Sequence, residues 1–153
     1  MDWTTSKRQI YFEVGSLRDI YVLDATTSDW KKWVDLVNKN YNVEFWDAKT
    51  GLTTDKIDFT AVKEYWDSNG KREVITATIK LDIINIKCHF FDESEIENDV
   101  DPSEINSQDD HDKFIDYLID ISVSLHKDVI VTDENTKGLS IGESNAWKIH
   151  FKP

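Results

Sequence analysis

The fold is decided at residues 73–91, which read EVITATIKLDIINIKCHFF. The runs 73–80 and 83–91 are rich in β-branched and aromatic residues, and each has the length of a strand. We predict that the two runs form an antiparallel hairpin. Their joint near Leu81-Asp82 has no Asn-Gly turn, so the sequence leaves the register of the hairpin open.

Two helices are predicted on the N-terminal side of this hairpin. Residues 28–39 follow a capping box formed by Thr26 and Asp29, and their apolar residues recur at helical spacing: Trp30, Trp33, Val34 and Val37. A shorter helix is predicted over residues 60–67, because Asn69-Gly70 then supplies the glycine that commonly follows a last helical turn.

The segment 114–125 fits two patterns. A helical stripe is formed by Phe114, Leu118, Ile121 and Leu125, whereas the alternation of Tyr117, Ile119, Ile121, Val123 and Leu125 is that of a strand. The length of the segment and a cap formed by Ser107 and Asp110 favour the helix.

Further strands are predicted outside the hairpin, at residues 8–14 (RQIYFEV), 17–23, 43–46, 128–132 and 146–151. Strands and helices mix without a regular βα repeat. This order favours a single α+β domain over residues 1–153, with two or three helices packed on one mostly antiparallel sheet.

The charge of the chain restricts its partners. The 18 basic and 30 acidic residues give a net charge of −12, which argues against binding a nucleic-acid backbone or an anionic membrane. No apolar run is long enough to span a bilayer, and the polar start of the chain does not resemble a secretory signal, so a cytoplasmic protein is expected. A single cysteine, Cys88, excludes an internal disulfide framework.

An internal acidic segment at residues 92–112 carries most of the net charge. It has no Lys or Arg and ten acids: Asp92, Glu93, Glu95, Glu97, Asp99, Asp101, Glu104, Asp109, Asp110 and Asp112. Ile96, Val100 and Ile105 can anchor it to the body of the protein. Because Pro102 cannot donate a backbone hydrogen bond, a central strand is not expected here, and we predict an acidic flap that lies over the domain.

Calcium loops and a cysteine nucleophile do not fit the sequence. A calcium loop that starts at Asp99 has Glu104 where glycine is required, and one that starts at Asp133 has Lys137 at a ligand position. Cys88 and His89 are adjacent on a predicted strand, so their side chains point to opposite faces and cannot form a catalytic pair. Cys88 is therefore interpreted as a small buried apolar residue.

Paired carboxylates with aromatic platforms would suit a glycoside hydrolase, and the chain has six tryptophans. Four of them lie in apolar faces of predicted elements and are interpreted as core residues: Trp30, Trp33, Trp66 and Trp147. Trp3 and Trp46 are the tryptophans expected to be least buried. No catalytic residue, cofactor or metal ligand is assigned.

A protein interface suits the acidic segment best. Glu95, Glu97, Asp99 and Asp101 alternate around Ile96 and Val100, so like charges gather on one side at a cost in folding free energy. We predict a partner-binding surface formed by these four residues with Glu104, and with Trp46 as a rigid aromatic anchor. Tyr41 and Trp66 are further candidates for anchors.

In size, acidity and lack of catalytic motifs the chain resembles bacterial immunity proteins, which neutralise a cognate toxin. The resemblance implies a non-catalytic inhibitor of a basic partner, such as a nuclease whose positive cleft the carboxylates could occupy. Two alternatives stay open: a hard-cation (Ca or Mg) binding protein or small enzyme that uses the acidic segment, and a cytoplasmic adaptor that opposes no toxin.

Overall fold

The computed structural model describes residues 2–12, 15–134 and 147–149, and of the last three only the backbone. The helices in this part of the chain are α1 Trp3–Gln9, α2 Thr27–Asn40, α3 Phe59–Asp67, α4 Gln108–Leu125 and the short 3₁₀ helix η1 Pro102–Glu104. The strands are β1 Arg18–Val22, β2 Asn42–Asp47, β3 Leu52–Thr54, β4 Ile75–Leu81, β5 Ile84–Cys88, β6 Ile96–Val100, β7 Val129–Asp133 and β8 Trp147–Ile149.

These strands form one sheet in the order β3-β2-β4-β5-β6-β1-β7-β8, and each neighbouring pair is antiparallel. The α+β fold predicted from the sequence is therefore confirmed. The predicted hairpin is β4 and β5, and its register pairs Leu81 with Ile84. Asp82 turns the chain with a φ of 61°, a conformation that aspartate tolerates better than most residues.

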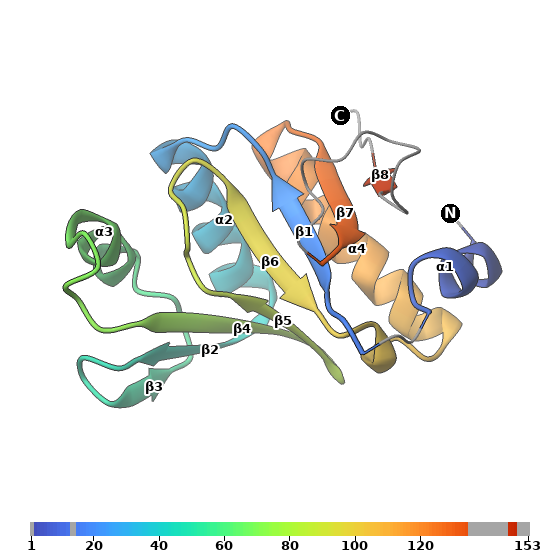
Figure 1. The fold of residues 1–153 in the computed structure, drawn as a ribbon, viewed down its shortest axis with the longest axis horizontal. Coiled ribbons are helices and arrows are strands. Elements are labelled where there is room, and N and C mark those ends of the chain that lie inside the picture. The colour runs from blue at the N-terminus through green and yellow to red at the C-terminus, as the bar shows by residue number, and fades with distance from the viewer. Residues whose placement is uncertain (1, 13–14, 135–146, 150–153) are drawn as a thin grey trace.

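Helices α2 and α4 cover one face of the sheet, behind the strands in the view of Figure 1. Alternate residues of β4 are buried in the core beneath them: Ile75, Ala77, Ile79 and Leu81. The capping boxes at Thr26 and Ser107 are both formed, so the helices predicted over 28–39 and 114–125 are confirmed and the strand interpretation of 114–125 is wrong. The predicted helix 60–67 is α3.

Two predictions need correction. The described part of the strand predicted over 8–14, residues 8–12, is not a strand. Helix α1 runs to Gln9; Asp2 caps its start, and the ring of Trp3 packs against Tyr11. The helices in the described residues are accordingly more numerous than the two or three expected. The acidic segment is not a flap either, since β6 is a central strand between β5 and β1.

The correction to the acidic segment has a simple physical reason. Ile96, Asn98 and Val100 alternate along β6 and all three are buried in the core. Pro102 lies beyond the strand, at the start of η1, where its missing N–H costs no sheet hydrogen bond. The acids of the segment therefore occupy the outward positions of a buried strand.

One further prediction concerns the end of the chain. β8 lies within the strand predicted over 146–151, while residues 146, 150 and 151 of that strand are outside the described residues. Within the described ranges no helix combines the length and apolar character needed to cross a lipid bilayer.

A buried arginine joins the N-terminal segment to the sheet. Arg18 begins β1 and is 1% exposed. Its guanidinium donates to the carbonyl oxygens of Ile10 at 2.7 Å, Phe12 at 2.8 Å and Leu17 at 2.9 Å, and lies 3.5 Å from a carboxylate oxygen of Asp133. The charge is thus surrounded by acceptors, as a buried guanidinium requires.

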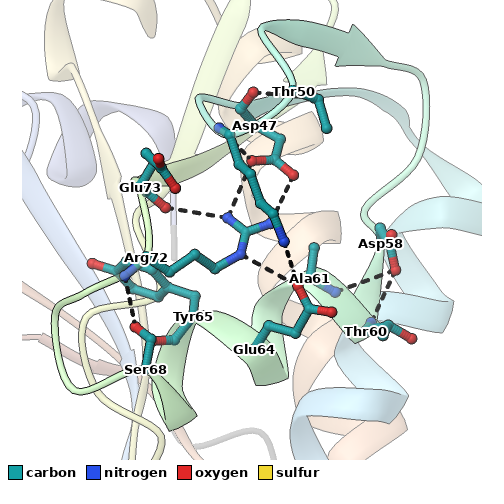
Figure 2. Close-up of polar contacts among 11 residues, drawn as sticks. Asp47, Thr50, Asp58, Thr60, Ala61, Glu64, Tyr65, Ser68, Arg72 and Glu73 are labelled. Carbon is teal, nitrogen blue, oxygen red and sulfur yellow. Dashed lines mark hydrogen bonds and ion pairs between the residues drawn. The ribbon is translucent and has the colours of Figure 1, made fainter.

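A second ion pair ties the end of α3 to β2. Figure 2 shows the Arg72 guanidinium between the carboxylates of Asp47 and Glu64. Two nitrogens of Arg72 donate to the two Asp47 oxygens, at 3.1 and 2.8 Å, and both side chains are largely buried. The Arg72 hydrogen bonds lower the pKa of the Asp47 carboxyl, and the N–H of Lys49 adds to the effect.

This pair predicts a loss of stability in acid. A carboxyl whose pKa is lower in the folded than in the unfolded state stabilises the fold above the unfolded pKa, near 4, and that contribution disappears as the pH falls through the folded pKa. We expect Asp47→Asn to lower the free energy of unfolding by roughly 1–3 kcal/mol at pH 7 and by much less at pH 2. Urea unfolding of wild type, Asp47→Asn and the exposed control Asp55→Asn at both pH values tests this. An equal loss for Asp47→Asn at pH 7 and pH 2 would contradict it.

Candidate protein-binding face

The acids of β6 lie on the face of the sheet opposite α2 and α4. Glu97 and Asp99 alternate with the buried residues of the strand, and Glu95 precedes it with the same parity. Between them Asn98 points into the core, where its side-chain oxygen accepts a hydrogen bond of 2.8 Å from the Tyr117 hydroxyl of α4. This buried bond fixes β6 in rotation, so Glu95, Glu97 and Asp99, here called the carboxylate row, face away from the helices.

Neighbouring strands add polar groups to the carboxylate row. Asp99 is the register partner of Lys87 on β5 and of Asp19 on β1. The Tyr21 hydroxyl donates to Asp19 at 3.0 Å and lies 3.5 Å from Glu97, so it bridges two carboxylates. Burial, together with the charge of Asp19, raises the pKa of Tyr21, which keeps this donor protonated.

Aromatic residues line the same face on the side of β2 and β5. Trp46 is 41% exposed, and its register partner Thr76 has its hydroxyl 3.4 Å from Nδ1 of His89. His89 stacks on Phe91 with ring centroids 5.2 Å apart, and its Nε2 lies 3.5 Å from the Asp99 carboxylate. Trp46, His89 and Phe91, here called the aromatic strip, therefore run beside the carboxylate row, and the two together are the binding face.

Two residues predicted for this surface, Asp101 and Glu104, follow the end of β6 and accept hydrogen bonds within the protein. Asp101 follows β6 and caps η1, because its carboxylate accepts a 2.9 Å hydrogen bond from the N–H of Ser103. Glu104 accepts from the backbone N–H of Asn85 at 2.7 Å and from its side-chain amide at 3.0 Å. Glu104 thus joins η1 to the start of β5, and its carboxylate is engaged within the protein.

The other candidate anchors are engaged as well. Trp66 packs against Trp30 with ring centroids 5.0 Å apart, and Tyr41 donates to Asp120 at 2.5 Å on the helical side of the sheet. Trp3, which with Trp46 was expected to be least buried, is partly buried and packs against the core. Trp46 is exposed as predicted.

The metal ligands and the thiol considered in the sequence do not form a site among the described residues. No group of three or more His, Cys, Asp or Glu side chains among these residues is placed to hold a metal ion. Asp110, the last position of the calcium loop considered from Asp99, accepts from the N–H groups of Asn106 and Ser107 at the start of α4. Cys88 is fully buried, as predicted, and burial raises the pKa of its thiol.

The chain was compared with protein-family models, with curated proteins and with solved structures. No family model, curated protein or solved structure matches it. The binding face is therefore interpreted from its own geometry.

Sequence analysis missed two members of this face, His89 and Phe91. The signal was present, because both have the parity opposite to buried Cys88 in the predicted strand 83–91. What was lacking was the pairing of β5 with β6, which brings that side of β5 against the carboxylate row.

Proposed function

We propose that the protein binds and blocks a basic protein, in the manner of an immunity protein that neutralises a toxin. The observation that carries this proposal is the carboxylate row beside the aromatic strip on one rigid sheet face. Carboxylates of one sign steer a positive partner and speed its association, and exposed aromatic rings supply the buried contacts that slow dissociation.

The rigidity of the support favours binding over mere solubility. Acids that only keep a protein soluble can sit on any exposed loop, whereas Asp99 faces Asp19 directly across two paired strands. Asp19 is itself buried, at 4% exposed, and its carboxylate accepts a 3.0 Å hydrogen bond from Tyr21. The paired strands thus hold Glu95, Glu97 and Asp99 at fixed positions, where a cationic partner can meet them together.

The test begins with capture of the partner at low ionic strength and continues with kinetics on that purified protein. We expect neutralisation of Glu95, Glu97, Asp99 and Asp101 together to slow association at least about tenfold at low salt, with a much smaller difference at high salt. Stopped-flow association rates across a salt series measure this, and thermal melts confirm that the variant is folded.

The matched control removes the same number of negative charges elsewhere, at the exposed residues Asp35, Asp55, Glu73 and Asp112. Its association rate should stay within about twofold of wild type. If both quadruple variants slow association equally, the effect comes from net charge and not from the binding face. If the first variant associates at the wild-type rate, the binding face does not recognise the partner. Restored growth of cells that produce the captured protein, on co-production of this chain, tests the inhibitory part.

A further inference from the structure

A hollow of about 370 Å³ opens beside the segment that joins β5 to β6. It is lined by Tyr65, Trp66, Gly70, Phe91, Asp92 and Glu93. Three aromatic residues and two acidic residues thus border one space, and Phe91 links that space to the binding face.

The ring of Trp66 is held in place. Its indole N–H donates to the carbonyl oxygen of Phe90 at 2.8 Å, and the ring packs edge-on against the buried Trp30. The part of Trp66 that stays exposed lines the hollow as a preorganised surface. A ligand that stacks there does not have to order the ring first.

Phe91 is more exposed than any other large apolar side chain that the structure describes, at 66%. Its ring is nonetheless supported on one side, because it stacks on His89 with an interplanar angle of 27°. His89 in turn contacts Asp99, so the hollow is continuous with the carboxylate row through a single side chain.

The two acids of the hollow are also positioned by hydrogen bonds. Glu93 accepts from the Thr27 hydroxyl at 3.0 Å, and its backbone carbonyl accepts from the indole N–H of Trp30 at 2.8 Å. Asp92 accepts from the N–H and the hydroxyl of Ser94, both at 2.8 Å. Gly70 adds no side chain to the hollow, and a Cβ built at its position would meet no atom within 4 Å.

We infer that this hollow receives an arginine side chain of the protein partner, an inference that rests on the proposed function. A guanidinium is planar and stacks on aromatic faces, whose negative potential attracts cations. It also pairs with carboxylates through two parallel N–H donors, which a lysine ammonium cannot do. Aromatic residues and two acids that line the same hollow are the combination that suits this side chain.

The pocket can be tested without the partner. The probe is N-acetyl-arginine amide, and the neutral isostere N-acetyl-citrulline amide is its matched control. We expect the arginine probe to shift the Trp66 indole N–H resonance saturably in ¹⁵N-edited NMR titrations at low ionic strength. The citrulline probe should bind at least about fivefold more weakly, because it lacks the charge that both the rings and the carboxylates attract.

Protein variants separate ring from charge contributions. Phe91→Leu keeps an apolar side chain without the π face, and Glu93→Gln removes one charge; each should weaken the arginine probe about three- to fivefold. Leu52→Ala and Asp55→Asn, which change exposed residues on β3 and just after it, should leave its affinity unchanged.

Equal affinity for the arginine and citrulline probes, or unchanged affinity in Phe91→Leu, would overturn the inference. Equal affinity for N-acetyl-lysine amide would overturn the assignment to arginine. These outcomes are independent of the proposed function, whose own test is the association rate of the variant neutralised along β6. If the arginine probe does not bind but the variant neutralised along β6 associates slowly, the arginine pocket is refuted and the binding face is supported. If the probe binds but that variant associates at the wild-type rate, the binding face is refuted and the pocket for an arginine remains.

Discussion

Arg18→Met is expected to lower the free energy of unfolding by about 3–5 kcal/mol, a large part of the roughly 5–15 kcal/mol typical of a single domain. The loss follows from the surroundings of the guanidinium, which is 1% exposed and donates to the backbone carbonyls of Ile10, Phe12, Ser16 and Leu17. Methionine fills similar space but leaves these acceptors without donors and Asp133 without its nearby cation.

The matched control for this prediction is Arg8→Met. Arg8 is exposed near the end of α1, so its substitution should change stability by less than about 0.5 kcal/mol. Urea denaturation followed by far-UV circular dichroism measures both. A loss below about 1 kcal/mol for Arg18→Met would mean that water replaces the guanidinium at little cost.

The second large effect is the loss of stability expected when a buried tryptophan is replaced, compared with an exposed one. Trp30→Ala is expected to cost about 3–5 kcal/mol, because its 1% exposed ring contacts Trp33, Trp66 and Phe90 and collapse around the cavity would be incomplete. The substitution also leaves the Glu93 carbonyl without the indole donor.

Trp46→Ala should cost less than about 1 kcal/mol, because this ring is 41% exposed on the binding face. Under the proposed function the same substitution weakens partner binding instead, by tenfold or more, as expected for an aromatic anchor. Circular dichroism is the suitable probe for both variants, since each substitution removes a fluorophore. Comparable losses of stability in the two variants would contradict the division into core and interface tryptophans.

The helices capped by Thr26 and Ser107 were predictable because their signals are local. A capping box needs only residues three positions apart, and an apolar stripe can be counted along one segment. The hairpin of β4 and β5 has the same local character, although its register depended on the left-handed Asp82, which no Asn-Gly pair announces.

The elements that were wrongly predicted depend on contacts distant in sequence. Residues 8–14 have a strand-like composition, yet α1 extends to Gln9, with Asp2 as its cap and with Trp3 packed on Tyr11 and on the distant His111. The prediction excluded a central strand here because of Pro102, whereas Pro102 lies beyond β6 in η1. Asn98 is buried within β6, and its hydrogen-bond partner Tyr117 comes from α4. The side on which the acids lie was nevertheless visible in their alternation around Ile96 and Val100.

The candidate site divides in the same way. The carboxylate row and Trp46 could be selected from charge pattern and exposure alone. The aromatic strip needed the β5–β6 pairing, and the engagement of Glu104 with Asn85 needed the path of the chain after β6.

The position of β1 in the middle of the sheet has a consequence for how the chain folds. Its neighbours β6 and β7 are synthesised much later, with Arg18 paired to Val100 and to Asp133. The N-terminal strand must therefore wait for most of the polypeptide before it can insert, and such non-local pairing slows folding. During that interval both edges of β1 lack their partner strands, and the charges of Arg18 and Asp19 at its start discourage pairing between nascent chains. Charge at the start of β1 thereby also protects the molecule from aggregation while it is being made.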